Sequence, residues 1–408
     1  MESLEDFRRR ARAWIEANLE RRDPRRPLRT REENAALQAK LFDAGFTGFA
    51  VPKEYAGQGL SLDHQAVWVE EAGDYVTPQG YQVSIGMMMP TLLDLATEAV
   101  KKRHIPRMLR GEELFMQLLS EPSGGSDMAG ALTRATKRGD SYFISGSKMW
   151  SSGALNAHYG LCLARVNWDV PKHAGLGMFV LPLKAKGVTI QGIRPATGEE
   201  AHFCIEYFDD VEIPAEYVLG GECEGWASAQ RLLFHERNAV AGIGFGLGYQ
   251  TSGERQAGGG WRADLVSLAR KHQVLHDPAL AAQIADNHID SVVGGQLSAR
   301  VNTGLVSGKL KGQWGSLVKL NQGLDLPGNA ELGLSVAGAD GVIWSGNAPG
   351  GETTNTWLRY RGNTIAGGSN EIQRNIVSER LLGLPREPAD DRDVPFNELM
   401  KRRQQRQS

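Results

Sequence analysis

The stretch from Ala366 to Ile376 is the part of the sequence best suited to holding a nucleotide-like ligand, and it reads Ala-Gly-Gly-Ser-Asn-Glu-Ile-Gln-Arg-Asn-Ile. Gly367 and Gly368 lead into a polar turn that opens an amphipathic helix. The first N–H groups of a helix and its positive dipole end favour anionic or carbonyl oxygens. Because glycine has no Cβ, a flat ligand can also come close to the chain. The stretch therefore predicts a ligand-binding turn.

Two motifs in the middle of the chain add hydroxyl groups and an aromatic ring. Residues 118–127 read Leu-Leu-Ser-Glu-Pro-Ser-Gly-Gly-Ser-Asp, and residues 146–152 read Gly-Ser-Lys-Met-Trp-Ser-Ser. A flat ring rimmed with donors and acceptors needs hydroxyls, backbone N–H groups and an aromatic wall. The two motifs supply these kinds of group.

Composition points to small-molecule chemistry. The 408 residues are enough for two or three domains, each with a core of its own. The net charge of −2, with 23% charged residues, provides no global field that would attract nucleic acid or anionic lipid. Cys162, Cys204 and Cys223 have no metal-ligand spacing and form an odd set, which fits a reducing compartment. We interpret these cysteines as packing residues, and expect neither a metal site nor a nucleic-acid partner.

The sequence has no targeting or membrane signal that we recognise. No run of about 18 apolar residues occurs, and the first residues are acidic rather than basic followed by apolar. We therefore expect a soluble, cytoplasmic protein without a membrane partner. The basic runs at 101–107 and 401–406 could contact phosphate groups, but such runs are more often solvated faces.

Helical periodicity dominates the N-terminal third of the chain. Apolar residues recur at helical spacing at Leu4, Phe7, Ala11, Trp14, Ile15 and Leu19, and again from 37 to 44. A loop rich in proline and glycine at 51–61 ends in Ser61, which can cap a helix that begins near Leu62. From about residue 116 short alternating segments follow, at 142–145, 178–181 and 204–208, which indicate a small antiparallel β domain.

Helical spacing returns near Trp226 and continues to Leu382. Glycine-rich breaks at 258–260, 294–295 and 346–351 are expected to divide this part into several long helices, as a bundle requires. Helices followed by strands and again by helices predict an α+β architecture. After residue 385 the chain is charged and punctuated by proline, and we expect this tail to be solvated or to lie on a neighbouring subunit.

With the three motifs in this order, the chain resembles the acyl-CoA dehydrogenase family; segments 52–61, 207–214 and 225–226 also look like landmarks of that family. The resemblance implies an N-terminal helical domain over 1–115, a middle antiparallel β-barrel domain over 116–225 and a C-terminal four-helix bundle over 226–385, followed by a charged tail over 386–408. It also implies a tetramer, FAD as the cofactor and an acyl-CoA as the substrate.

The resemblance assigns the flavin contacts residue by residue. Those that would line the ring are Gln117, Leu118, Leu119 and Ser120; those that would close its other edge are Trp150, Ser151 and Ser152; and those that would hold its distal portion are Gly368, Ser369, Asn370 and Glu371. Taken without the motif, Trp150 would be a core residue of a β domain. Ser126 matches an acyl-CoA contact but could equally be a turn residue, and Arg237 is a second candidate for binding the substrate.

One departure concerns the cofactor. A subgroup of the family carries Arg-Gln where this chain has Ala281 and Ala282, and that arginine reaches the pyrophosphate bound to an adjacent subunit. Arg270 could substitute for it, but spacing alone does not establish this. Whether FAD is bound at every subunit is therefore open.

Dehydrogenation between C2 and C3 of a thioester needs a carboxylate to remove the α-proton while hydride leaves C3. In most relatives this acid stands in the C-terminal turn, where this chain has Gly367. In the isovaleryl and long-chain subgroups it stands on a bundle helix, at a position that matches Glu236. Apolar neighbours would raise the pKa of Glu236 toward neutrality; the alternative is a surface pair with Arg237. The backbone N–H of Gly367 would bind the enolate oxygen.

Two other functions fit the same scaffold. The chain could be the weakly catalytic or non-catalytic subunit of a heterotetrameric acyl-CoA dehydrogenase, as Ala281 and Ala282 suggest, although Glu236 argues against it. It could also be a flavin-dependent monooxygenase, which would not need a carboxylate at 236. We expect a dehydrogenase, with electron-transferring flavoprotein as the electron acceptor. Chain length, branching or rings of the acyl group are not defined by the sequence, although branched, long and ring-bearing groups fit a base on the bundle helix.

Overall fold

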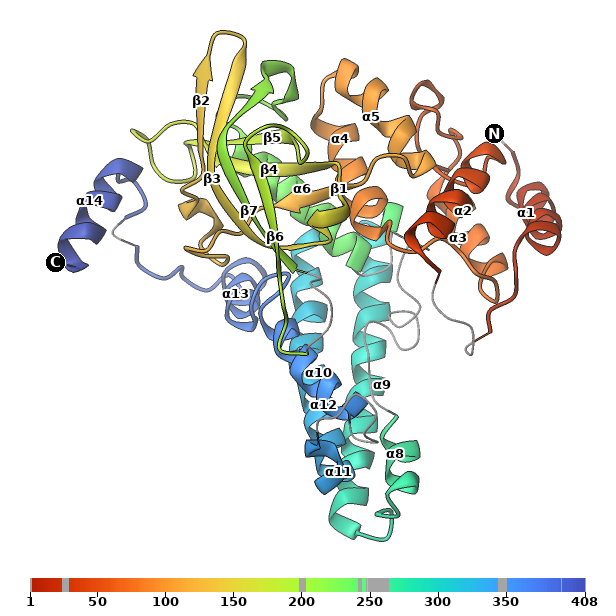
Figure 1. The fold of residues 1–408 in the computed structure, drawn as a ribbon. Helices are drawn as coiled ribbons and strands as arrows, with labels where there is room; N and C mark the ends of the chain where they lie inside the picture. The colour runs from red at the N-terminus through yellow and green to blue at the C-terminus, as the bar shows by residue number, and fades with distance from the viewer. Residues whose placement is uncertain are drawn as a thin grey trace. The chain divides into compact units, whose positions relative to one another are not determined.

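The computed structural model describes residues 2–23, 29–197, 203–240, 244–246, 248, 264–343, 351–389 and 391–407 (Figure 1). The chain divides into two compact units. The first contains Met1–Arg194, Glu200–Thr251 and Ala389–Ser408, and the second contains Pro195–Glu199 and Ser252–Pro388. Among the described helices, none combines the length and the apolar character that a membrane crossing requires.

The N-terminal part of the first unit is helical, as predicted. Its helices are α1 (Leu4–Asn18), α2 (Arg31–Asp43), α3 (Leu62–Glu71), the π-helix η2 (Gln82–Met88), α4 (Met89–Leu95) and α5 (Glu98–Arg110). The predicted apolar stripe of α1 is confirmed, because Phe7, Ala11 and Ile15 are buried. Ser61 is the N-cap residue of α3, and its N–H donates to Nδ1 of His64 at 3.3 Å. Both the start of this helix and its cap are therefore as predicted.

The basic run at 101–107 lies on α5 and is only partly solvated. His104 is buried there, and its Nδ1 lies 2.7 Å from Glu113. Glu113 also pairs with Arg107 at 3.1 Å. These contacts show that at least part of the run is engaged within the protein.

The middle of the first unit is a curled β domain, coloured yellow to green in Figure 1. Within the described residues it contains β1 (Phe115–Leu118), β2 (Arg134–Arg138), β3 (Ser141–Ser152), β4 (Tyr159–Arg165), β5 (Leu176–Pro182), β6 (Val188–Ile193) and β7 (Phe203–Pro214). The sheet order is β1-β4-β2-β3-β7-β6, and β5 pairs with β4. The pairing is mainly antiparallel, but β1 runs parallel to β4.

The three predicted segments lie in β3, β5 and β7, and burial alternates at 142–145 and 204–208, but the alternation predicted for 178–181 is wrong because all four residues are buried. β4 and β5 are buried along nearly their whole length. A strand covered on both faces needs apolar residues at successive positions, and both sequences have them. Cys162 and Cys204 are buried packing residues, as expected, whereas Cys223 is exposed, so its interpretation as a packing residue was wrong.

The helix α6 (Gly225–Val240) groups with the first unit. The second unit contains α8 (Leu265–Lys271), α9 (Pro278–Val306), α10 (Gly315–Ala337), α11 (Ala339–Val342), α12 (Gly351–Tyr360), α13 (Asn370–Ile376) and the π-helix η9 (Val377–Leu381). The predicted break at 294–295 is wrong, because both glycines lie inside α9. The breaks at 258–260 and, for the most part, at 346–351 fall outside the described residues, and α12 begins at Gly351.

The prediction of a solvated tail is confirmed for residues 385–389 and 401–405, which are exposed, but is wrong at Phe396 and Leu399, which are buried. The tail forms α14 (Phe396–Gln407), and Phe396 is fully buried against Trp168 with ring centroids 5.5 Å apart. The backbone N–H of Phe396 donates to the carbonyl of Val170 at 2.9 Å. Phe396, in an otherwise charged segment, therefore helps to attach the tail to the β domain of its own chain.

Candidate functional site

The first motif follows β1 at the edge where this strand ends. Leu118 and Leu119 are buried and fix the strand against the core. The side chain of Gln117 is half-buried, and its Oε1 is shielded from solvent without a hydrogen-bond partner among the described residues. Ser120 is partly exposed. A buried amide oxygen without a donor is costly, so this end of β1 is suited to receiving a donor from a bound ligand.

Glu121, the residue after Ser120, closes a buried ionic network. Its carboxylate accepts from Nζ of Lys148 at 2.8 Å and from the N–H groups of Leu132 and Thr133 at 2.6 and 3.0 Å. Burial would raise the pKa of Glu121, but Lys148 and the two backbone donors outweigh it and lower the pKa. Because Lys148 also donates to the carbonyl of Leu119 at 3.1 Å, the network ties the two motifs together.

Trp150 is turned outward by a bulge in β3. The pairing with β7 shifts register between Met149 and Ser151, and Trp150 adopts φ +68°. Residues other than glycine rarely take that conformation, and the result is a tryptophan that is 54% exposed. Ser152 is partly exposed. The sheet thus presents an aromatic face to solvent where the sequence predicts the wall of a flavin site.

Ser151 points the other way, into the β domain, where its hydroxyl donates to the carboxyl of Glu206. Glu206 lies on β7 and is fully buried, and its Oε2 accepts no hydrogen bond within the part of the chain that the structure describes. Because burial withdraws this carboxyl from water, the pKa of Glu206 is raised to about 7, although the Ser151 bond and the charge of Lys148 both lower it.

Ser126 lies in an exposed turn between Glu121 and the short helix η3 (Met128–Gly130). The turn begins with a reciprocal backbone pairing of Glu121 and Gly124 at 3.0 and 3.2 Å. Because Ser126 is exposed, its hydroxyl is accessible. This fits both interpretations of Ser126, as a turn residue and as a ligand contact.

The helix α6 carries Glu236 and Arg237, both half-buried. Their neighbour His235 is buried, and its Nε2 lies 2.7 Å from Asp94 of α4. Burial lowers the pKa of His235, and Asp94 opposes that shift. The described residues contain no group of three or more His, Cys, Asp or Glu side chains that could hold a metal ion.

The C-terminal motif forms the predicted turn in the second unit. Gly367 and Gly368 have φ values of +67° and +90°, a region that favours glycine. Ser369 caps α13 by accepting from the N–H of Ile372 at 3.3 Å, and the exposed Glu371 lies in its first turn. Asn370 is buried and donates to the carbonyl of Gly323 at 3.1 Å, while its Oδ1 has no partner among the described residues.

The turn is braced from within. Nε2 of Gln373 donates to the carbonyls of Gly367 and Gly368 at 3.0 and 3.3 Å. A Cβ atom on Gly368 would come within 2.5 Å of that nitrogen. The tight turn therefore needs glycine at this position.

These residues fit a flavin. The β domain offers an exposed indole, the hydroxyl of Ser120 and the amide oxygen of Gln117, which has no partner among the described residues. The second unit, taken by itself, offers a glycine turn and the Oδ1 of Asn370, for which the described residues likewise provide no partner. Such groups suit a flat ring with a polar rim and a polar tail. The β-domain groups belong to the first unit and the glycine turn belongs to the second.

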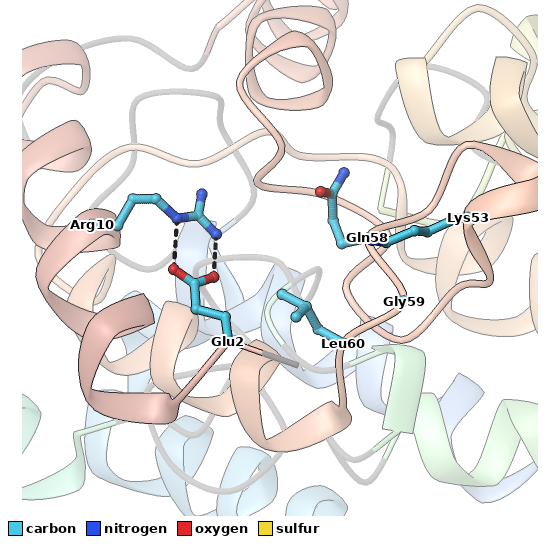
Figure 2. A pocket seen from close by; sticks show the side chains of 6 residues that line it. All are labelled: Glu2, Arg10, Lys53, Gln58, Gly59 and Leu60. Atoms are coloured by element: carbon cyan, nitrogen blue, oxygen red, sulfur yellow. Dashed lines mark hydrogen bonds and ion pairs between the residues drawn. The ribbon is translucent and has the colours of Figure 1, made fainter.

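A surface hollow of about 520 Å³ lies elsewhere, between α1 and the loop before α3 (Figure 2). Its lining includes Glu2 and Arg10, which satisfy each other through two hydrogen bonds of 3.0 and 2.7 Å. None of the predicted site residues lines it. The hollow shows no group poised for chemistry, so the motif residues remain the better candidate site.

Comparison with known proteins identifies the family. The chain matches the N-terminal, middle and C-terminal domains of acyl-CoA dehydrogenase over residues 1–112, 117–211 and 224–382. The chain belongs to the acyl-CoA dehydrogenase family. The predicted family and its three-part α+β fold are thus confirmed, and so is the prediction of an enzyme. This acyl-CoA dehydrogenase is an oxidoreductase of a flavin-dependent family.

Individual relatives agree along the whole chain. Acyl-CoA dehydrogenase IpdE1 of Mycobacterium tuberculosis is 33% identical over 413 residues, covering 95% of this chain and 99% of the relative. The solved structure of a steroid acyl-CoA dehydrogenase, Tcur3481-Tcur3483, has a TM-score of 0.71 and 26% identity and covers 95% of this chain and 99% of its own. The ChsE4-ChsE5 complex of Mycobacterium tuberculosis shares the fold, with a TM-score of 0.70 and 23% identity over 95% and 99% of the two chains.

The sequence motifs do not reveal that Glu121 and Glu206 of this acyl-CoA dehydrogenase are buried carboxylates. A signal existed for Glu206, because Cys204, Glu206 and Phe208 alternate along β7 and all three are buried. Period-two reasoning would have placed this glutamate on the inner face.

Proposed function

We propose that this acyl-CoA dehydrogenase binds FAD and converts an acyl-CoA thioester to its trans-2-enoyl-CoA. The observation that carries the proposal is the glycine at position 367, where most relatives have an acid. Gly367 adopts φ +67° in a turn that Gln373 braces. Glu236 on α6 is then the carboxylate that the family pattern offers as the base.

Glu236 would take the α-proton from C2. It is half-buried on a helix whose inner face is fixed by Leu232, His235 and Ala239, which would hold its carboxylate in a constant orientation. A partly desolvated carboxylate is a stronger base than one in water. The flavin, when bound, accepts the hydride from C3. The N–H of Gly367 would stabilise negative charge on the thioester oxygen, which makes the α-proton more acidic.

The flavin contacts would come from both motifs of the β domain and from the C-terminal turn. Gln117 and Ser120 would bond to the ring rim, Leu118 and Leu119 would support it, and Trp150 would cover it. Because the hydroxyl of Ser151 is already bonded to Glu206, Ser151 would contribute through its backbone, with Ser152 beside it. Gly368, Ser369, Asn370 and Glu371 would hold the distal portion.

We propose a ring-bearing acyl-CoA, of the kind found on steroid degradation intermediates, as the substrate class. The support is the 26% identical enzyme described as a steroid acyl-CoA dehydrogenase, which covers 95% of this chain. Ser126 and Arg237 are the proposed contacts to the thioester. Electron-transferring flavoprotein is the proposed electron acceptor.

An oligomer is also part of the proposal, either a homotetramer or a heterotetramer with a related subunit. On α9, Ile289, Val292 and Val293 are 57%, 46% and 55% exposed. Apolar side chains clustered on one long helix are typical of an interface. The steroid enzyme Tcur3481-Tcur3483 and the ChsE4-ChsE5 complex are each named for two components, which supports testing for a heteromer.

A non-catalytic subunit is the second candidate. Ala281 and Ala282 lie in the first turns of α9, which Asp277 caps and Pro278 begins, and neither can reach a pyrophosphate. If this function holds, the purified chain alone will be colourless and will gain a flavin spectrum only with its partner.

The test is to purify the chain, record its visible spectrum and titrate a panel of straight, branched and ring-bearing acyl-CoAs for flavin bleaching. Glu236→Gln should keep flavin and ligand binding and slow bleaching by about 10²- to 10⁴-fold. Glu216→Gln, an exposed glutamate outside the site, is the matched control. Bleaching of Glu236→Gln at the wild-type rate would remove Glu236 as the base.

A further inference from the structure

The C-terminal tail is attached to the β domain directly beside the turn that carries Ser126. Pro395 forms a bridge with Pro171, and the N–H groups of Phe396 and Asn397 donate to the carbonyls of Val170 and Trp168, both at 2.9 Å. Phe396 is fully buried. Leu399, on the same helix, is buried as well, whereas residues 401–405 are exposed. The attachment of the tail is therefore concentrated at the start of α14.

Phe396 rests on the buried guanidinium of Arg165, with 3.8 Å between Cζ and the ring centroid. Arg165 in turn donates to the carbonyls of Ala129 at 2.5 Å, Ala131 at 3.3 Å and Lys172 at 2.7 Å. A buried arginine must satisfy its donors, and here two of the acceptors belong to the segment that follows Ser126. Arg165 therefore connects the tail to that segment.

A second connection runs through Asp127, the residue after Ser126. Its carboxylate accepts from Nζ of Lys172 at 3.0 Å and from Arg403 of α14 at 3.4 Å. Lys172 also lies 3.7 Å from Asp391 of the tail. Burial would raise the pKa of Asp127, but Lys172 and Arg403 outweigh it and lower the pKa. The turn is thus held from the tail side by an ionic contact as well as by the Phe396 anchor.

The other end of the same turn is fixed without the tail. Glu121 holds the N–H groups of Leu132 and Thr133 and pairs with Lys148. The start of the turn consequently has its own support, whereas the tail supports Asp127 directly and Ala129 and Ala131 through Arg165, in the residues that follow Ser126.

We infer that the tail is a positioning element for the substrate: Phe396 acting through Arg165, and Arg403 acting through Asp127, hold residues 124–131 in the conformation that binds an acyl-CoA thioester. The inference rests on the proposed function, in which Ser126 contacts that thioester. Loss of the tail contacts is expected to weaken acyl-CoA binding while flavin content is unchanged, because the proposed flavin contacts lie on other segments.

The experiment compares four variants of the full-length, flavin-loaded protein: Phe396→Ala, Phe396→Leu, Arg403→Ala and Arg402→Ala. Arg402 is the matched control, since it lies on the same helix and its recorded ion pair, at 3.9 Å, is with Glu398. Four quantities are measured: amide hydrogen exchange of residues 124–133, the Kd of the acyl-CoA that best bleaches the wild type, flavin content and melting temperature.

Phe396→Ala should raise both the exchange rate and the Kd about tenfold, and Arg403→Ala should raise both by about threefold, as expected for loss of a desolvated cation–π contact and of a partly exposed ion pair. Arg402→Ala should stay within about twofold of wild type. Phe396→Leu keeps an apolar side chain over Arg165 but loses the cation–π contact, so its exchange rate and Kd should lie between those of wild type and Phe396→Ala. Flavin content should not change. Arg403→Ala keeps the test valid if Phe396→Ala fails to fold.

Unchanged exchange in both Phe396→Ala and Arg403→Ala would overturn the inference. Faster exchange with an unchanged Kd would overturn its substrate part. Failure of the proposed function is seen separately, because the wild-type protein itself would then bind no acyl-CoA of the panel.

Discussion

Two buried glutamates of the β domain, Glu121 and Glu206, face the same lysine and behave in opposite ways. Lys148 is the register partner of Glu206 across β3 and β7, yet its Nζ bonds to Glu121. Glu121 has the lysine and two backbone donors, and its pKa is lowered. Glu206 has the hydroxyl of Ser151, and burial raises its pKa to about 7. The number of donors, and not the depth of burial, decides which carboxyl is charged.

Among the described residues, few charged groups lie around Glu206. They are Lys148 on β3 and, beyond it, Glu121, while the thiols of Cys162 on β4 and Cys204 on β7 lie in the same region. Lys148 cannot neutralise two carboxylates at once. Glu206 is therefore the group that keeps its proton, directly behind the bulge that exposes Trp150.

Removal of the shared lysine should have the largest effect. Lys148→Met leaves Glu121 as a buried charge without its cation, and this should lower the free energy of unfolding by about 3–5 kcal/mol. Urea unfolding of the flavin-loaded protein measures the change. Lys137→Met, which removes an exposed lysine paired with Glu222 at 3.3 Å, should cost less than about 1 kcal/mol. Similar losses in the two variants would contradict the role assigned to Lys148.

Glu206 should make stability depend on pH. In the unfolded chain its carboxyl loses the proton near pH 4.5, whereas in the folded protein it keeps the proton to about pH 7. Wild-type stability should therefore fall as the pH rises from about 4.5 to about 7 and level off above, by up to about 3 kcal/mol. Glu206→Gln should not show this fall.

The measurement is the difference in unfolding free energy between Glu206→Gln and wild type at pH 5, 6, 7 and 8. Glu212→Gln, at an exposed position of the same strand, serves as control and should follow wild type. A difference that is flat with pH would show that Glu206 titrates normally in the folded protein.

Replacing Glu121 with glutamine should change the free energy of unfolding in the opposite direction to Glu206→Gln. Glu121→Gln leaves Lys148 without its counter-ion and weakens two backbone hydrogen bonds, so at pH 7 it should cost about 2–3 kcal/mol. Glu206→Gln should stabilise at that pH. Thermal unfolding of the two variants side by side is the check, and shifts of melting temperature in the same direction would break the comparison.

The sequence was sufficient for the features that depend on local pattern. The stripe of Phe7, Ala11 and Ile15 predicts a buried helix face, and Ser61 predicts a helix start, because each signal lies within a few residues of its effect. The glycines at 367 and 368 predict a turn for the same reason. The motif order gave the family, which in turn implies the three-part fold.

What the sequence did not reveal depends on partners far along the chain. The outward turn of Trp150 results from a bulge against β7, and the burial of Phe396 results from Arg165 and Trp168. Nothing near residue 206 shows that the donors of Lys148 are already used by Glu121 and Leu119. Such competition for one cation becomes visible only when the strands are paired. The roles of Glu236, Ser126 and the other site residues stay predictions.

The smallest effect is expected at Ser151. Its hydroxyl is a hydrogen-bond donor to Glu206 and favours the charged form, so Ser151→Ala should raise the pKa of Glu206 further. The cost should be about 1 kcal/mol at pH 8, where the carboxyl is ionised, and smaller at pH 5, where it is protonated. Infrared absorption of the carboxyl across the pH range measures the shift, and Ser141→Ala, on the same strand but bonded to Glu212, is the control. Because Ser151 would serve the flavin through its backbone, flavin content should stay at the wild-type level; a loss of flavin in Ser151→Ala alone would mean that the hydroxyl, and not the chain, is what the cofactor needs.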